Sequence, residues 1–157
     1  GCPGNGYLGG MRHAHSPLKT MVLIVLLALL LPATATAQSE GGLADWIYRT
    51  SAHRISGYVT LGLATVTATL GLLDVPYHPI VGISTAASAS VTLGLGSIAY
   101  SDRLSRFWPH AVLTGVATAG FLTNVIFLEG GSTAHVATGI ASTAALAAGY
   151  GAILLLK

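Results

Sequence analysis

The fold of this chain is decided by residues 53–100, which read HRISGYVTLGLATVTATLGLLDVPYHPIVGISTAASASVTLGLGSIAY. Two apolar runs, residues 55–73 and 79–101, contain no Asp, Glu, Lys or Arg, and a short turn separates them. Each run is about long enough to cross roughly 30 Å of hydrocarbon at about 1.5 Å per residue. The stretch therefore predicts a pair of antiparallel helices of membrane-spanning length.

The second half of the chain repeats this pattern, because residues 111–128 and 136–156 are also free of charged side chains. Over the whole chain 52% of the residues are hydrophobic and only 8% are charged, and the mean hydropathy is +0.70. A water-soluble bundle would need charged outer faces on these helices, and the runs offer none. We expect an all-α integral membrane four-helix bundle whose surroundings are a lipid bilayer, with no nucleic acid as partner.

The front of the chain carries features of export. Two basic residues, Arg12 and Lys19, precede an apolar run at residues 21–31, and the small-x-small sequence ATA follows at residues 35–37. This order predicts an upstream extension and a cleavable signal peptide within residues 1–37. A fifth membrane helix is the weaker interpretation, since eleven apolar residues are short for a span.

Two regions follow the predicted cleavage site: an interfacial segment at residues 38–52 and a transmembrane domain at residues 53–157. Residues 42–49 predict a short interfacial helix, with Leu43, Trp46 and Ile47 facing lipid. A signal peptide directs the chain after it across the membrane, so we expect a multi-pass protein of the bacterial cytoplasmic (inner) membrane with a periplasmic amino terminus. The positive-inside tendency favours the opposite orientation, because the basic residues of the domain then all lie outside.

One histidine stands at the start of each apolar run: His53, His78, His110 and His135. They are 25, 32 and 25 residues apart, so each histidine of the first half has a counterpart 57 residues later. The spacing predicts two tandem helical hairpins. Short connections at residues 74–77 and 129–134 make the helices of each hairpin antiparallel. We therefore expect His53 to face His110 near one membrane surface, and His78 to face His135 near the other.

Imidazole can bind haem iron without carrying charge into the membrane, and a helix start favours its neutral form. Two facing pairs predict two b haems per chain, held by His53/His110 and His78/His135, while one haem on one pair is the alternative. The only cysteine, Cys2, lies in the part expected to be removed, so covalent haem attachment is not expected. Taken singly, each histidine would more ordinarily be a helix cap or a headgroup contact.

Glycine follows three of the histidines after four residues, at Gly57, Gly82 and Gly139, and follows His110 after five, at Gly115. An i, i+4 pair shares one helix face, so these glycines could leave room for a flat macrocycle; ordinary small-residue helix packing is the competing explanation. Three arginines near one end, Arg54, Arg103 and Arg106, could pair with haem propionates or with lipid phosphate.

Four core helices with histidines at alternating ends, paired first to third and second to fourth, resemble the di-haem core of cytochrome b561 and of related ferric reductase-like or bacterial b-type cytochromes. The resemblance covers residues 53–157 and rests on the four histidines. It implies that His53, His78, His110 and His135 are axial haem ligands and that electrons cross the bilayer between two b haems. This chain has four expected helices where the eukaryotic members have six, and it shows no ascorbate-binding signature.

The expected function is transmembrane electron transfer, with the quinone pool or a periplasmic or membrane redox protein as partner. The chain could serve as the membrane subunit of a quinol or ferric oxidoreductase. Two other classes stay open: a metal or small-solute permease, and a structural subunit of a membrane complex without cofactor. A permease would need polar groups through the membrane midplane, where the sequence offers only Ser, Thr and the amide of Asn124.

Overall fold

A computed structural model describes residues 42–155, and the predicted signal peptide and cleavage site lie outside the described residues. The described part is all-helical and contains no strand. Its helices, in chain order, are α2 (Leu43–Arg49), α3 (Ala52–Leu72), α4 (His78–Ala99), the 3-10 turn η1 (Ser101–Arg103), α5 (Leu104–Ile126) and α6 (Thr133–Leu155).

Helices α3 to α6 have the length and composition of membrane spans. They contain 21, 22, 23 and 23 residues, enough to cross a bilayer at about 1.5 Å per residue. Each includes a window that is apolar enough to lie in hydrocarbon. The prediction of four membrane-length helices is confirmed, and the described part is that of a multi-pass membrane protein.

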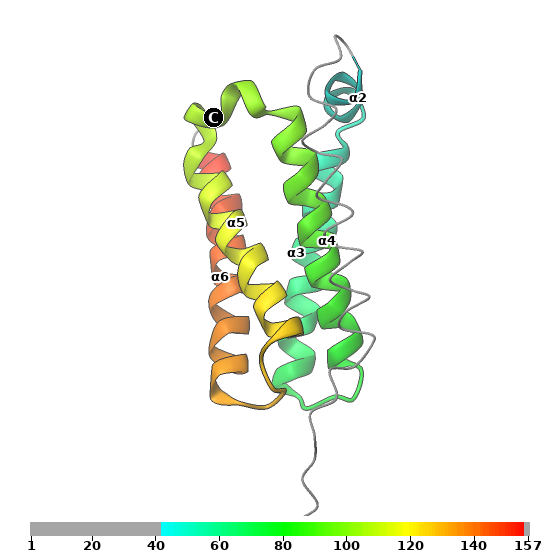
Figure 1. Cartoon of the computed structure of the whole chain (residues 1–157), viewed down its shortest axis with the longest axis vertical. Helices are drawn as coiled ribbons and strands as arrows, with labels where there is room; N and C mark the ends of the chain where they lie inside the picture. The colour runs from blue at the N-terminus through cyan, green and yellow to red at the C-terminus, as the bar shows by residue number, and fades with distance from the viewer. Residues whose placement is uncertain (1–41, 156–157) are drawn as a thin grey trace, which may run out of the picture.

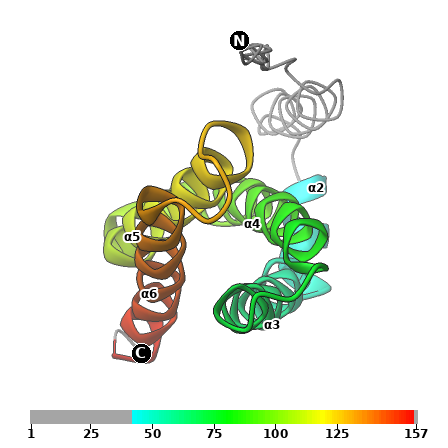
Figure 2. The same cartoon turned by 90° about the horizontal axis from the view of Figure 1, so that it is seen from below.

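The four long helices form two antiparallel hairpins, α3 with α4 and α5 with α6 (Figure 1). Seen along the bundle axis, they follow one another around an arc whose two ends are α3 and α6 (Figure 2). The hairpin turns match each other: Asp74 in the first has a φ of 52°, and Gly131, 57 residues later, has a φ of 79°. The repeat inferred from the histidine spacing is therefore also present in the backbone of the turns.

Small side chains let the helices approach closely. The apolar centre consists of Ala64, Ala86, Ala89 and Ala117 with two larger residues, Phe121 and Leu146. Within the first hairpin, buried hydroxyls add hydrogen bonds between the helices: the Thr60 hydroxyl lies 2.7 Å from that of Ser88 and 2.9 Å from that of Thr92. In a membrane, close contact and such hydrogen bonds replace the hydrophobic effect as the source of helix association.

Helix α5 begins earlier than the sequence suggested. Pro109 was expected to mark the start of the third membrane helix, whereas α5 begins at Leu104 and contains Pro109. The backbone at Phe107 is non-helical (φ −109°, ψ 18°), so a kink lies just before the proline. Proline lacks an N–H and its ring crowds the preceding turn, which explains why the interruption lies there. At the start of α6 the expected cap is present, because Ser132 Oγ accepts the backbone N–H of His135 at 3.1 Å.

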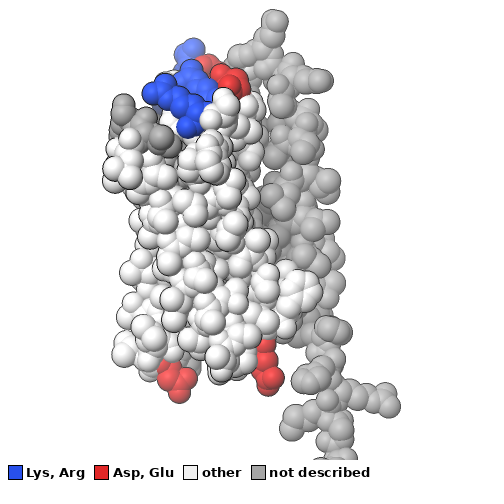
Figure 3. All heavy atoms as spheres, turned by 90° about the vertical axis from the view of Figure 1, so that its left-hand side faces the viewer, with Lys and Arg blue, Asp and Glu red and all other residues white. Residues whose placement is uncertain are grey.

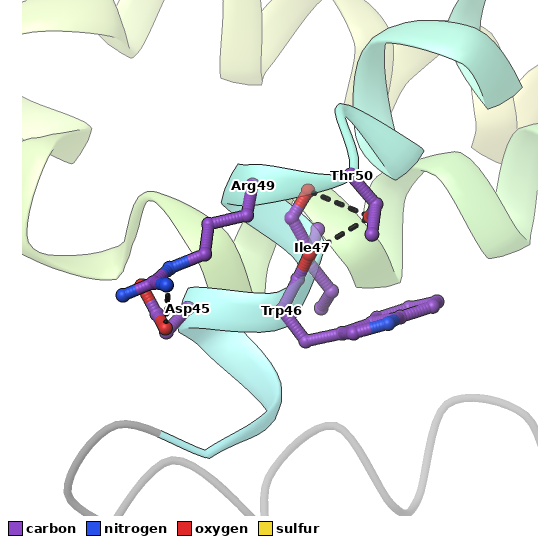
Figure 4. A network of polar contacts seen from close by, with 5 residues as sticks. All are labelled: Asp45, Trp46, Ile47, Arg49 and Thr50. Atoms are coloured by element: carbon purple, nitrogen blue, oxygen red, sulfur yellow. Dashed lines mark hydrogen bonds and ion pairs between the residues drawn. The ribbon is translucent and has the colours of Figure 1, made fainter.

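The short helix α2 lies against the end of α3 and α4. Arg49 Nε donates to Asp45 across one turn at 3.0 Å, and Thr50 Oγ1 donates to the carbonyl of Trp46 at 2.8 Å (Figure 4). Ile47 is only 1% exposed, while Trp46 is 55% exposed. The prediction that Ile47 faces lipid is therefore wrong: it packs inward because this helix rests on the bundle with one face.

Charged side chains gather at the two ends of the bundle and leave the wall between them apolar (Figure 3). The arginines of the described part belong to the end formed by α2 and η1: Arg49, Arg54, Arg103 and Arg106. The opposite end carries Asp74 and Glu129, one in each hairpin turn. The two membrane surfaces of the protein therefore differ in the sign of their charge.

Candidate functional site: two histidine pairs

His78 and His135 face each other at the end of the bundle that carries the hairpin turns. His78 is the first residue of α4, and His135 lies in the first turn of α6. Their Nε2 atoms are 3.3 Å apart, and the ring centroids are 5.6 Å apart at an angle of 73°. Both rings are half-buried. The structure thus brings together two imidazoles that are 57 residues apart in the chain.

The other pair lies at the opposite end, where His53 begins the second residue of α3 and His110 follows the kink in α5. Their ring centroids are 6.1 Å apart at an angle of 83°. Each ring also has an aromatic neighbour: Tyr100 lies 5.5 Å from His53, and Tyr150 lies 6.2 Å from His110, both edge-on. Both histidine pairs expected from the spacing are therefore close neighbours in the structure.

Three of the four imidazoles are held by backbone carbonyls of the partner helix in their hairpin. The Nδ1–H groups donate to Thr92 O from His53 at 3.0 Å, to Thr67 O from His78 at 3.0 Å and to Gly149 O from His110 at 2.9 Å. A carbonyl only accepts, so the proton of each neutral ring lies on Nδ1 and the lone pair lies on Nε2. This is the tautomer and the support that metal-binding histidines require.

A pocket of about 910 Å³ lies around the His78/His135 pair, between the two hairpins. Its walls are mostly apolar and include Phe121 and Val125, with Asn124 among its few polar residues. Cofactor pockets have this character, with volumes of about 300–1,000 Å³ and few polar groups. The pocket therefore has the size and the lining of a site for a large, mainly apolar molecule.

The donor set of each pair suits haem better than a bare metal ion. Among the described residues, no group of three or more His, Cys, Asp or Glu side chains is placed to hold a metal. A zinc site normally takes four ligands, whereas haem iron needs only two from the protein, one on each side of its plane. A metal–imidazole bond is about 2 Å, so His78 and His135 Nε2 would have to separate from 3.3 Å to about 4 Å. The residues of this pair therefore fit an iron porphyrin after a small shift.

The glycines predicted to make room for a macrocycle have different surroundings. Gly82 and Gly139 line the pocket. At Gly57, a side chain would collide with the Tyr150 hydroxyl, so that space is filled by protein. Nothing lies within 4 Å of a Cβ placed on Gly115. The structure therefore brings only Gly82 and Gly139 to the pocket at a histidine pair.

Two glycines that the sequence did not single out receive the imidazole rings. A Cβ on Gly71 would lie 2.9 Å from His78 Cε1, and a Cβ on Gly96 would lie 2.6 Å from His53 Cε1. Each glycine stands on the opposite helix of the hairpin from the histidine that it contacts. The available signal was the antiparallel register of the hairpin, which the hydrophobic pattern does not specify to the residue.

The arginines expected to meet haem propionates are exposed and have local contacts. Arg54 Nη2 donates to Ser51 Oγ at 3.2 Å, and Arg103 lies 3.6 Å from Asp102. The Arg106 guanidinium stands 5.6 Å from the centre of the Phe107 ring. All three lie at the end of the bundle where His53 and His110 meet, but none contacts either imidazole through a hydrogen bond in the described part.

Comparison of the chain with protein-family models, with curated proteins and with solved structures found no match. The functional interpretation therefore rests on the geometry of the two histidine pairs.

Proposed function

We propose that this protein is a b-type cytochrome that carries electrons across the membrane. The observation that carries the proposal is the facing of His78 and His135, whose Nε2 atoms lie 3.3 Å apart inside a largely apolar pocket. Carbonyl-bound Nδ1–H groups on three of the four imidazoles leave Nε2 free to bind iron. A haem on each pair would supply one-electron redox chemistry at both ends of the bundle.

The chain's own residues would provide position and exclusion. Thr67, Thr92 and Gly149 hold three rings in place through their carbonyls, so little ordering remains when a ligand binds. Both axial positions would be taken by imidazole, which leaves none for oxygen or substrate and favours electron transfer over oxygen activation. Close helix packing around Ala64, Ala86 and Ala117 keeps water from the space between the pairs.

The proposal also covers location and partners. A signal peptide would place the amino terminus of the mature chain in the periplasm and the turns containing Asp74 and Glu129 in the cytoplasm of a bacterium. Electrons would be exchanged with a quinone in the membrane or with a redox protein at its surface. In a Cys2→Ser background, Asp74→Cys should resist a membrane-impermeant maleimide in intact spheroplasts and react after lysis. Labelling of intact spheroplasts would reverse the orientation.

The decisive experiment is an absorption spectrum of the protein purified in mild detergent. Reduced-minus-oxidised bands of six-coordinate b haem, with about two haems per chain by the pyridine haemochrome assay, are expected. His78→Ala should remove one haem, and His110→Ala should remove the other. Ile80→Ala is the matched control, since Ile80 lies two residues after His78 on the same helix but is 66% exposed.

A colourless protein that is folded, and that stays colourless after incubation with haemin, would refute haem binding. The permease and the structural subunit would then be the remaining classes. Haem retained in both histidine variants would refute the assignment of the ligands. Because the variants act on different pairs, a loss of all haem in one variant is checked by its helical circular dichroism, which must match that of Ile80→Ala.

A further inference from the structure

The hydrogen bonds that hold the histidines follow a rule of position. In the first hairpin, His53 uses the carbonyl 39 residues later, and His78 uses the carbonyl 11 residues earlier. In the second hairpin, His110 again uses the carbonyl 39 residues later. Both the tandem repeat and the antiparallel register of the hairpins therefore assign a partner to the fourth histidine. For His135 the equivalent position, 11 residues earlier, is Asn124.

Asn124 and His135 are the two residues whose buried polar atoms lack a partner. Among the described side chains, Asn124 Oδ1 and His135 Nδ1 are the buried nitrogen or oxygen atoms with no hydrogen bond. Both residues line the same pocket. Asn124 Nδ2 lies 3.1 Å from the position of a Cβ on Gly139, one helical turn after His135. The amide therefore stands beside the turn of α6 that carries the imidazole.

We propose that Asn124 is the positioning residue of His135, with its side-chain Oδ1 accepting the Nδ1–H. Burial of an unpaired donor and an unpaired acceptor costs about 1–3 kcal/mol for each group, so a small rotation that joins them is favoured. The bond would place the His135 lone pair on Nε2, which already points at His78. Its consequences for haem rest on the proposed function, whereas the bond itself does not.

The proposal distinguishes His135 from the other three histidines. Their partners are main-chain carbonyls, which every substitution preserves, whereas the partner of His135 is a side chain that mutation can remove. Such a partner fixes the orientation of a ligating imidazole and raises its basicity, and its loss typically lowers metal affinity about 10–100-fold. One of the two sites is therefore expected to be sensitive to a single residue that does not itself bind iron.

The hydrogen bond is tested first in haem-free protein in detergent micelles, with ¹⁵N-labelled histidine and the His135 signal assigned by its loss in His135→Gln. We expect an Nδ1–H tautomer for His135 in the wild type, loss of its slowly exchanging proton in Asn124→Leu, and retention in Asn124→Asp, which keeps an acceptor oxygen. Thr67→Val is the matched control at the equivalent position, because His78 is held there by the main chain. An unchanged His135 signal in Asn124→Leu would overturn the proposal.

Haemin titration then tests the consequence. Asn124→Leu should weaken binding at one of the two sites about 10–100-fold and leave the other unchanged. Asn124→Asp should restore binding and shift the midpoint potential of that haem alone to lower values, since a carboxylate makes the imidazole more electron-donating. Equal affinity in wild type and Asn124→Leu would refute the positioning role. A wild type that binds no haem would refute the proposed function, while the NMR result would still decide whether the bond exists.

Discussion

His78 Nε2 lies 3.3 Å from His135 Nε2, although the two residues begin different hairpins and stand 57 positions apart in the chain. Each is reached by the same offset from its counterpart in the other pair, His53 and His110. Two lone-pair nitrogens that approach each other in an apolar pocket repel unless a proton or a metal lies between them. The facing therefore suggests a ligand site rather than ordinary core packing.

Histidine variants should behave as two independent pairs. Within a pair, His78→Ala combined with His135→Ala should remove no more haem than either change alone, because one imidazole already suffices to lose six-coordination. Across pairs, His78→Ala with His110→Ala should remove both haems. Haem content and circular dichroism measure these effects. Partial haem loss that adds up within one pair would contradict the pairing.

Substitution of Gly96 should disturb the other site by displacing the ring of His53. A Cβ there would lie 2.6 Å from His53 Cε1, so Gly96→Val should break the hydrogen bond to Thr92 O and lower the haem content by about one per chain. Gly94→Val is the matched control, since nothing lies within 4 Å of its Cβ position on the same helix. Equal haem content in the two variants would show that Gly96 does not seat the ring.

Gly57 is expected to matter for stability, because Tyr150 fills the space above it. Gly57→Ala should destabilise the protein by about 1–3 kcal/mol, as overpacking does in a close-packed core. Thermal unfolding in detergent, followed by circular dichroism, measures this loss. The Tyr150→Leu change should relieve it in the double variant. Gly62→Ala has open space around the added Cβ and should leave the transition almost unchanged.

The hydroxyl of Thr60 should stabilise the first hairpin. It is fully buried and lies within hydrogen-bond distance of both Ser88 and Thr92 on α4. Thr60→Val keeps the shape and removes these bonds, with an expected loss of about 0.6–2 kcal/mol, the range for such bonds between membrane helices. Thr65→Val, which removes a bond only to Leu61 O on its own helix, is the control. Equal stability of the two variants would assign Thr60 no role between the helices.

Much of the fold could be predicted from the sequence, because charge-free runs of about 20 residues and short turns leave few arrangements. The start of α5 could not: five residues before Pro109 are helical with a kink at Phe107, and this depends on packing against η1 and α4. The direction of Ile47 could not be predicted either, since a helix of seven residues has no long repeat to define its buried face.

The site was predicted in part. The positions of the four histidines indicated which rings meet, but the seats at Gly71 and Gly96 were missed. Asn124 was noted only as a polar group of the membrane middle, whereas it lies two residues before the end of α5, beside the His78/His135 pocket.

The sequence by itself determined the class of fold, the number of membrane-length helices and the end of the bundle at which each histidine lies. These follow from length and apolarity, which act along one helix at a time. Only the tertiary structure decided which carbonyl meets each Nδ1, which glycine receives each ring and which imidazole stays without a partner. Those features depend on the rotation of each helix and its register against its neighbour. A shift of one residue turns a helix face by about 100°, so weakly amphipathic membrane helices settle these angles through side-chain packing alone.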